Sequence, residues 1–185
     1  GHASKTVELH ASLESKLTAV EQIKASFGKY SIESPKHIDT RSGSKFQHIK
    51  LVKDKELGSA FAFSLRKDID GDRDKLWPTG RERQRIEIKG YQRSPEPMKA
   101  ISSETHQVKW YLKIEKSFQI NKEFCHFFQL KAVGTKNTDD PLLTLSGVMD
   151  HGEPQLQLQW WSEVDEGRVF LADWENCKGK WLICE

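Results

Sequence analysis

The sequence Arg-Glu-Arg-Gln-Arg-Ile-Glu-Ile-Lys-Gly-Tyr at residues 81–91 decides the fold class, because polar and apolar side chains alternate along it. Successive side chains of a β-strand point to opposite faces of a sheet. One face of a strand here carries four charged side chains, those of Arg83, Arg85, Glu87 and Lys89. The other face directs Ile86 and Ile88 into a core. The stretch therefore predicts a half-buried strand with a largely cationic outer face.

Alternation of this kind recurs along most of the chain. Strands are expected at residues 46–53, 60–66, 84–91, 106–115, 124–133, 142–148, 155–161, 168–171 and 181–184. Turn-forming Gly, Pro, Asn and Asp residues separate them. Many short strands with polar residues at alternate positions favour antiparallel sheets packed face to face. The predicted fold is all-β, an antiparallel β-sandwich of jelly-roll type with an N-terminal helix.

The N-terminal segment has a different period. Apolar residues recur there at mostly three- and four-residue spacing, at Leu9, Leu13, Leu17, Val20 and Ile23. This spacing predicts one amphipathic helix over residues 7–27 that ends at Gly28. A length of 185 residues suits one domain. We therefore expect a helical segment at residues 1–28 and a single β-domain at residues 29–185.

Composition narrows the class of partner. Charged residues make up 30% of the chain, yet the net charge is only +2, so affinity for a polyanion has to come from local clusters of charge. A general nucleic-acid coat protein is disfavoured. No apolar run approaches the roughly 20 residues that span a bilayer, so no membrane partner is expected. The three cysteines form no close metal-binding pair.

A second stretch, Phe-Cys-His-Phe-Phe-Gln-Leu-Lys-Ala-Val at residues 124–133, repeats the alternating arrangement. Alternation places Gln129 and Lys131 on one face and His126, with its phenylalanine neighbours, on the other. We expect His126 to be a core histidine, with a functional role as the alternative. Beside the strand at residues 81–91, this strand would complete a polar, basic groove floor that suits an anionic ligand.

Each candidate group also has a structural interpretation. The charged strand faces are compatible with an anion site or with solvated outer faces that carry cross-strand ion pairs. His48 and His106 are candidates for a general base because we expect them to be exposed. Tyr111 and Trp161 are candidates for stacking on a sugar, since alternation assigns neighbouring tryptophans to the core.

Four carboxylates recur at alternate positions in a turn-forming segment, at Asp68, Asp70, Asp72 and Asp74. Such spacing suits a calcium ion with oxygen ligands, although the glycine position and the missing glutamate differ from the usual calcium loop. A charged hairpin loop is the alternative. No nucleophile elbow, phosphate-binding glycine loop or zinc motif is present, so we expect no required cofactor, with calcium as a possible addition.

The strand Arg85-Ile-Glu87-Ile-Lys89, followed by Gln129-Leu-Lys131, resembles the paired strand motifs of jelly-roll polysaccharide lyases. In that family an Arg-x-Glu-x-Arg strand lies beside a Gln-x-His strand on the concave face. The wider sequence from residue 46 to residue 147 is similar to heparin-lyase-like and glucuronan-lyase-like proteins. The individual motifs are short, and their order and spacing carry the resemblance.

The resemblance implies β-elimination on a uronic-acid polymer. Arg85 and Gln129 would bind the uronate carboxylate and the charge that develops at it, and Glu87 would brace Arg85. Lys131 takes the place of the family's histidine, so the base is Lys131, His48, His106 or a tyrosine. Arg83, Lys89, Tyr111 and Trp161 would contact substrate. The family's C-terminal strand with a catalytic tyrosine has no counterpart, which predicts a fragment or a divergent member.

The sequence therefore predicts a lyase that cleaves an acidic polysaccharide, although whether the chain is an enzyme at all stays open. The first alternative is a non-catalytic, lectin-like β-sandwich that holds the same polysaccharide. The second is a structural domain whose charged strands face solvent. A secreted or periplasmic monomer is expected, with a leader that this sequence does not contain.

Overall fold

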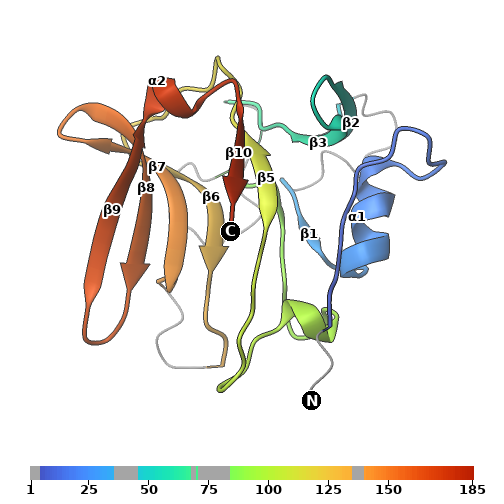
Figure 1. Ribbon diagram of the computed structural model, residues 1–185, viewed down its shortest axis with the longest axis horizontal. Coiled ribbons are helices and arrows are strands. Elements are labelled where there is room, and N and C mark those ends of the chain that lie inside the picture. Colours follow the sequence, from blue (N-terminus) through green and yellow to red (C-terminus); the bar gives the residue numbers. More distant parts are fainter. Residues whose placement is uncertain (1–4, 36–45, 68–69, 71–83, 135–139) are drawn as a thin grey trace. The chain divides into compact units, whose positions relative to one another are not determined.

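The computed structural model describes residues 5–35, 46–67, 70, 84–134 and 140–185 (Figure 1). The protein consists mostly of β-strands in antiparallel sheets and has few helices, with 38% strand and 11% helix. This confirms the predicted predominance of antiparallel β-structure. None of the helices in the described part is long and apolar enough to cross a membrane.

The chain divides into two compact units, residues 1–106 and residues 107–185. The division of the chain into a helical segment at residues 1–28 and one β-domain at residues 29–185 stays a prediction. Each of the nine predicted strands overlaps a strand of the structure, and the last one matches β10 (Trp181–Cys184) residue for residue.

In its described residues, the first unit holds one α-helix and two small antiparallel pairs of strands. Its elements are α1 (Ala19–Phe27), β1 (Ile32–Glu33), β2 (Ile49–Asp54), β3 (Gly58–Phe63), β4 (Glu87–Ile88) and a 3-10 turn, η1 (Glu96–Met98). β1 pairs with β4, and β2 with β3. Ile23 and Ile49 are buried at the centre of this unit, and Ile86 and Ile88 pack against them. The alternation predicted at residues 84–91 therefore holds.

Helix α1 begins later than its apolar spacing predicts. The Thr18 hydroxyl accepts a hydrogen bond from the Glu21 N–H at 3.2 Å, and the Glu21 carboxylate accepts one from the Thr18 N–H. This capping box fixes the first turn at Ala19. Upstream, the Ser12 hydroxyl accepts a hydrogen bond from the Ser15 N–H, and the Ser15 hydroxyl accepts one from the Leu17 N–H. These side-chain bonds take the place of helical backbone bonds.

The prediction of helix from residue 7 is therefore wrong for residues 7–18. The predicted end is confirmed, because the chain leaves the helix at Gly28 with φ of 101°. Only glycine adopts such a backbone angle without strain.

The second unit contains a four-stranded antiparallel sheet in the order β6-β7-β8-β9 (Figure 1). Its strands are β6 (Phe124–Leu130), β7 (Leu143–Asp150), β8 (Glu153–Trp161) and β9 (Glu166–Asp173). A second, two-stranded sheet pairs β5 (Trp110–Lys113) with β10. A short helix, α2 (Trp174–Cys177), follows β9.

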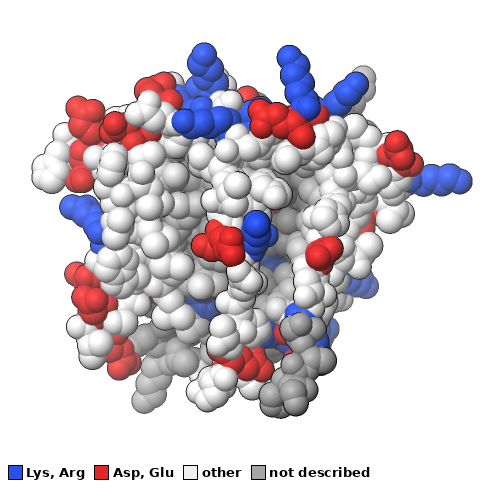
Figure 2. All heavy atoms as spheres, viewed as in Figure 1, with Lys and Arg blue, Asp and Glu red and all other residues white. Residues whose placement is uncertain are grey.

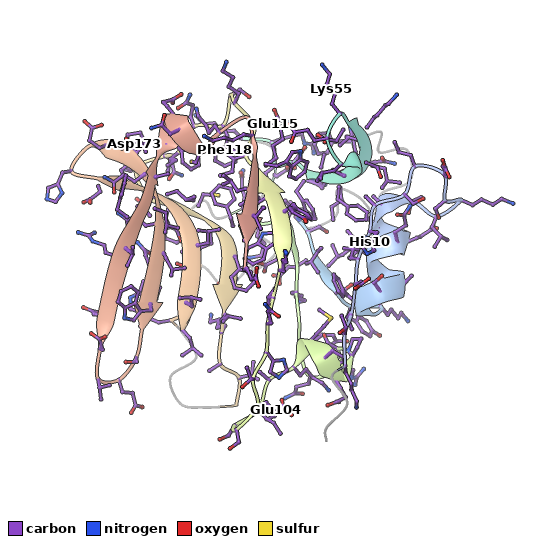
Figure 3. The ribbon with its side chains drawn as sticks, in the orientation of Figure 1. His10, Lys55, Glu104, Glu115, Phe118 and Asp173 are labelled. Atoms are coloured by element: carbon purple, nitrogen blue, oxygen red, sulfur yellow. The ribbon has the colours of Figure 1, made fainter. Side chains whose placement is uncertain are left out.

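The apolar face of the four-stranded sheet packs against β5, β10 and α2. Leu145 and Leu156 from the sheet meet Trp174, which is 1% exposed. The Trp110 ring of β5 stacks on Phe128 of β6, with ring centroids 4.6 Å apart. The Trp174 indole N–H donates to the carbonyl of Phe118, labelled in Figure 3, at 3.0 Å. The opposite face of the sheet therefore lies outside this core.

Candidate functional site

A β-bulge in β6 decides which side chains share the second face of the sheet. His126 pairs with Ser146 and Gln129 pairs with Thr144, with a shift of register between His126 and Phe128. Thr144 and Ser146 lie two residues apart on β7, so they point to the same side. His126 and Gln129 therefore share that side as well. The predicted separation of these two side chains is wrong, because the bulge inserts one residue between them.

Polar side chains from all four strands line this face, which we call the polar face. It carries His126, Gln129, Thr144, Ser146, Gln155, Gln157, Gln159 and Arg168. Trp161 follows on the same side of β8, as its alternation predicts. The face lies opposite the side chains of Leu145 and Leu156, which enter the core. One side of the sheet thus enters the core, and the other carries these polar side chains together with Phe124, Val148 and Phe170.

A chain of hydrogen bonds fixes the His126 ring. Nδ1 of His126 lies 2.6 Å from Oγ of Ser146, and the Ser146 hydroxyl donates to Oγ1 of Thr144 at 2.8 Å. Thr144 and Ser146 are both 0% exposed. A hydroxyl has one proton to donate, so a Ser146 hydroxyl that donates to Thr144 accepts from Nδ1–H of His126. This arrangement leaves the lone pair of the neutral imidazole on Nε2.

Three glutamines form a ladder along β8. The Gln157 amide donates to Gln155 at 3.0 Å, and the Gln159 amide donates to Gln157 at 3.1 Å. The ladder runs in one direction, with the Gln155 NH2 group at one end and the Gln159 carbonyl at the other. Sugar hydroxyl groups both donate and accept hydrogen bonds, so the half-buried amides of Gln155 and Gln159 suit a sugar ligand, whereas Gln157 is only 2% exposed.

The cationic strand predicted around Arg85 belongs to the first unit, where it forms an ion-pair cluster. Arg85 NH1 lies 3.2 Å from one oxygen of Glu33 and 3.6 Å from Glu87, and Lys89 Nζ lies 3.2 Å from the other oxygen of Glu33. Arg85, Glu87 and Lys89 thus share one side of the strand, as alternation predicts. Glu33 is buried and offsets part of the positive charge. Arg83 lies outside the described residues.

His48 occupies a different environment from the exposed one that we expected. Its side chain is 0% exposed, and Nε2 lies 3.0 Å from Oδ2 of Asp70. The other Asp70 oxygen accepts from the Arg66 guanidinium at 3.0 Å and 3.3 Å, and Oδ2 accepts from the Arg66 backbone N–H at 2.6 Å. The expectation of an exposed His48 is wrong, because a buried carboxylate holds this imidazole.

The residues that contact Asp70 determine the direction in which its pKa is shifted. Burial by itself raises the pKa of Asp70, but hydrogen bonds from Arg66 and His48 outweigh burial and leave the pKa below its ordinary value. The side chains of Arg66 and His48 therefore hold this carboxylate. Asp68, Asp72 and Asp74, the other predicted calcium ligands, lie outside the described residues. Within the described part, no three metal-ligating side chains gather.

The remaining candidates lie in separate places. His106 is exposed, with Nε2 2.9 Å from the carboxylate of Glu104 (labelled in Figure 3). Tyr111 is 51% exposed on the side of β5 away from the core. Lys131 is exposed just after the end of β6. The polar face therefore gathers Gln129 and Trp161 from the predicted set, and the convergence of Arg85 with Gln129 stays a prediction.

The sequence pattern did not predict that His126, Ser146 and the glutamine ladder lie on one surface. The signal for the bulge is the pair Phe127-Phe128, where two adjacent apolar residues interrupt strict alternation. On the face that Figure 2 shows, acidic and basic side chains are interspersed, so charge there gives no further guidance.

Comparison with known proteins adds no family. No protein-family model, no curated protein and no solved structure matches the chain. The likeness to jelly-roll lyases consequently depends on the strand motifs alone, and the case for function depends on the geometry of the polar face.

Proposed function

We propose that the chain is a polysaccharide lyase that cleaves a uronic-acid-containing glycan by β-elimination, with the polar face as its substrate surface. The observation that carries the proposal is the placement of His126 and Gln129 on one side of the sheet, with the His126 ring fixed by Ser146 at 2.6 Å. The proposal includes a jelly-roll arrangement of the strands.

β-Elimination needs a group that binds the uronate carboxylate, a base and an acid. The carboxylate makes the C5 proton acidic, and hydrogen bonds to it stabilise the enolate-like charge of the transition state. The Gln129 amide donates to the carboxylate in this proposal, with Arg85 as the cation that the family motif supplies. Neutral His126 removes the C5 proton through Nε2.

The electrons of the C5–H bond then form the C4–C5 double bond, and the C4–O bond breaks. The leaving oxygen takes a proton, for which Lys131 is the proposed donor because it follows Gln129 by two residues. No oxidant or cofactor enters this balance. The proposed protein is a secreted or periplasmic monomer, and calcium at the aspartate segment is no part of the mechanism.

A non-catalytic glycan-binding module is the second candidate. It is favoured by Glu33, which offsets Arg85 and Lys89 and lowers the positive charge that elimination would use. The glutamine ladder would still hold sugar hydroxyl groups without chemistry. The two candidates share a surface and differ in whether a bond is broken.

One assay separates them. The protein is incubated with glucuronan, alginate, heparin and pectin while the ultraviolet absorbance of unsaturated uronate is followed, and binding to each polymer is measured in parallel. Release of unsaturated product supports the lyase. Binding without product supports the binding module, and the absence of both contradicts the two candidates together.

A further inference from the structure

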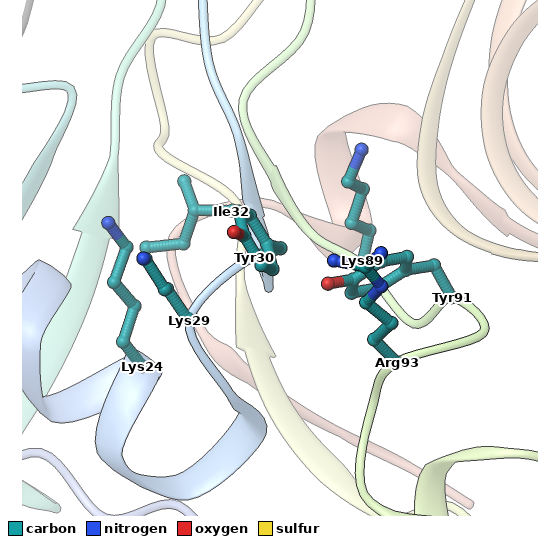
Figure 4. A pocket seen from close by; sticks show the side chains of 7 residues that line it. All are labelled: Lys24, Lys29, Tyr30, Ile32, Lys89, Tyr91 and Arg93. Atoms are coloured by element: carbon teal, nitrogen blue, oxygen red, sulfur yellow. The ribbon is translucent and has the colours of Figure 1, made fainter.

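A hollow of ≈ 460 Å³ in the first unit is lined by four cations and two tyrosines (Figure 4). Its lining residues are Lys24, Lys29, Tyr30, Ile32, Lys89, Tyr91 and Arg93. We call it the lysine–tyrosine pocket. Its volume falls within the range of small-ligand sites, roughly 300–1,000 Å³. The pocket shares no residue with the polar face.

Two short segments are tied together to form the pocket. The Lys89 N–H donates to the Ser31 carbonyl at 2.7 Å, and the Ser31 hydroxyl donates to the Gly28 carbonyl at 2.7 Å. Ser31 is fully buried. These bonds hold the turn after α1 against Lys89, the residue that follows β4, so both walls of the pocket are anchored.

The pocket concentrates positive charge. Lys89 is paired with Glu33, but in the part of the chain that the structure describes no carboxylate lies within ion-pair distance of Lys24, Lys29 or Arg93. None of the lining residues is acidic. Like charges held close together repel one another, and an anion that enters between them relieves that repulsion.

The tyrosines add a surface for a sugar. The Tyr30 and Tyr91 rings meet edge to face with centroids 5.9 Å apart, and Lys29 Nζ lies 5.4 Å from the Tyr30 centroid. Tyr30 is 49% exposed, so part of its ring faces solvent. An exposed aromatic ring beside hydrogen-bonding groups suits the apolar face of a pyranose and leaves the sugar hydroxyls solvated.

We propose that the lysine–tyrosine pocket binds a sugar that carries a phosphate or sulfate ester. Figure 4 shows Lys24 and Lys29 on one side of Tyr30, with Lys89, Tyr91 and Arg93 on the other. Lys24, Lys29 and Arg93 have no carboxylate partner among the described residues, and one uronate offers these three cations only two carboxylate oxygens. A tetrahedral ester offers three oxygens to cations that approach from different directions. This site goes beyond the proposed lyase and needs no turnover.

Isothermal titration calorimetry on the full chain tests the site with glucose 6-phosphate, glucose 6-sulfate, glucuronate and inorganic phosphate. Each sugar ester should bind about tenfold more tightly than glucuronate. The K24Q/K29Q variant should lose about tenfold in affinity for both esters, as expected for two lost charge contacts. The matched control K16Q/K55Q removes two exposed lysines elsewhere in the unit and should bind as the wild type does.

Three results would overturn the site. Equal binding of glucuronate and the esters removes the preference for a tetrahedral anion. If inorganic phosphate binds as tightly as glucose 6-phosphate, the sugar contributes nothing to binding and the proposed sugar site is contradicted. An equal loss in K24Q/K29Q and K16Q/K55Q removes the pocket. If only one of the two esters binds, the result supports the site and shows whether its ligand is a phosphorylated or a sulfated sugar.

Discussion

Nδ1 of His126 lies 2.6 Å from Oγ of Ser146, on the neighbouring strand of the same sheet. This contact exists because His126 and Ser146 are direct partners across the two strands, and the bulge after His126 brings Gln129 to the same side. The Ser146 hydroxyl donates onward to Thr144, so the contact orients the imidazole and selects the nitrogen that holds the lone pair. Ser146 is accordingly a positioning residue for the proposed base.

Ser146→Ala should lower kcat on the cleaved glycan about 10- to 100-fold, the size of effect seen when a residue that orients an imidazole is removed. KM should change little, because substrate contacts stay. Ser146→Thr keeps the hydroxyl and should recover most of kcat. The measurement is steady-state kinetics over a pH series, with Ser102→Ala, at an exposed site, as the control. An unchanged kcat in Ser146→Ala would remove the serine from the mechanism.

Glu33→Gln should lower the free energy of unfolding by about 1–2 kcal/mol. The substitution leaves Arg85 and Lys89 without their shared carboxylate in a half-buried setting, and the partial exposure of both cations moderates the cost. Urea unfolding at neutral pH measures the change. Arg168→Ala breaks a more exposed contact to Asp150 at 3.7 Å and should cost less than about 0.5 kcal/mol. Equal costs for both variants would contradict the account of the cluster.

Asp70 should make the first unit sensitive to acid. Its pKa in the folded protein lies below the ordinary 3.8, so its stabilisation is complete above that value and is lost as the pH falls through the lowered folded pKa. The wild type should therefore lose stability between neutral pH and pH values below 3.8. Asp70→Asn should be less stable at neutral pH and should show a smaller loss on acidification. Urea unfolding across the pH range tests this, and parallel losses in both proteins would contradict it.

Gly167 should not tolerate a methyl group. A Cβ at this position would overlap the Trp160 ring, which lies across Gly167 on the neighbouring strand. Gly167→Ala should lower stability by roughly 1–3 kcal/mol, because the ring has to leave its rotamer. Gly90→Ala is the matched control, since a Cβ there meets only the Met98 carbonyl at 3.4 Å. The thermal midpoints of the two variants are compared, and a Gly167→Ala midpoint equal to that of Gly90→Ala would contradict the packing.

Local patterns predicted the strands well, because strand periodicity records which side chains enter a core. Ile86 and Ile88 pack inward, and Trp110 faces the core while Tyr111 is exposed. The start of α1 was also readable, since Thr18 and Glu21 have the spacing of a capping box. The spacing of apolar residues, taken alone, placed the start of this helix too early in the sequence.

The candidate site was less predictable, because it depends on contacts between distant residues. The Glu33 partner of Arg85 comes from a two-residue strand 52 positions earlier in the chain. The pairing of His48 with Asp70 likewise joins residues that no local period connects. One inserted residue in β6 places His126 and Gln129 on the same side of the sheet, and strict alternation does not foresee such an insertion.

The most direct test of the lyase proposal compares His126→Gln with His151→Gln for release of unsaturated uronate from the polymer that the wild type cleaves. His151 is an exposed histidine in the turn between β7 and β8, paired with Asp150, so the control makes the same substitution at a histidine that is not part of the polar face. The account predicts a loss of roughly 10²- to 10⁴-fold in kcat for His126→Gln, with folding intact, and wild-type turnover for His151→Gln. Wild-type turnover in His126→Gln, or no unsaturated product from the wild type on any uronate polymer, would contradict it.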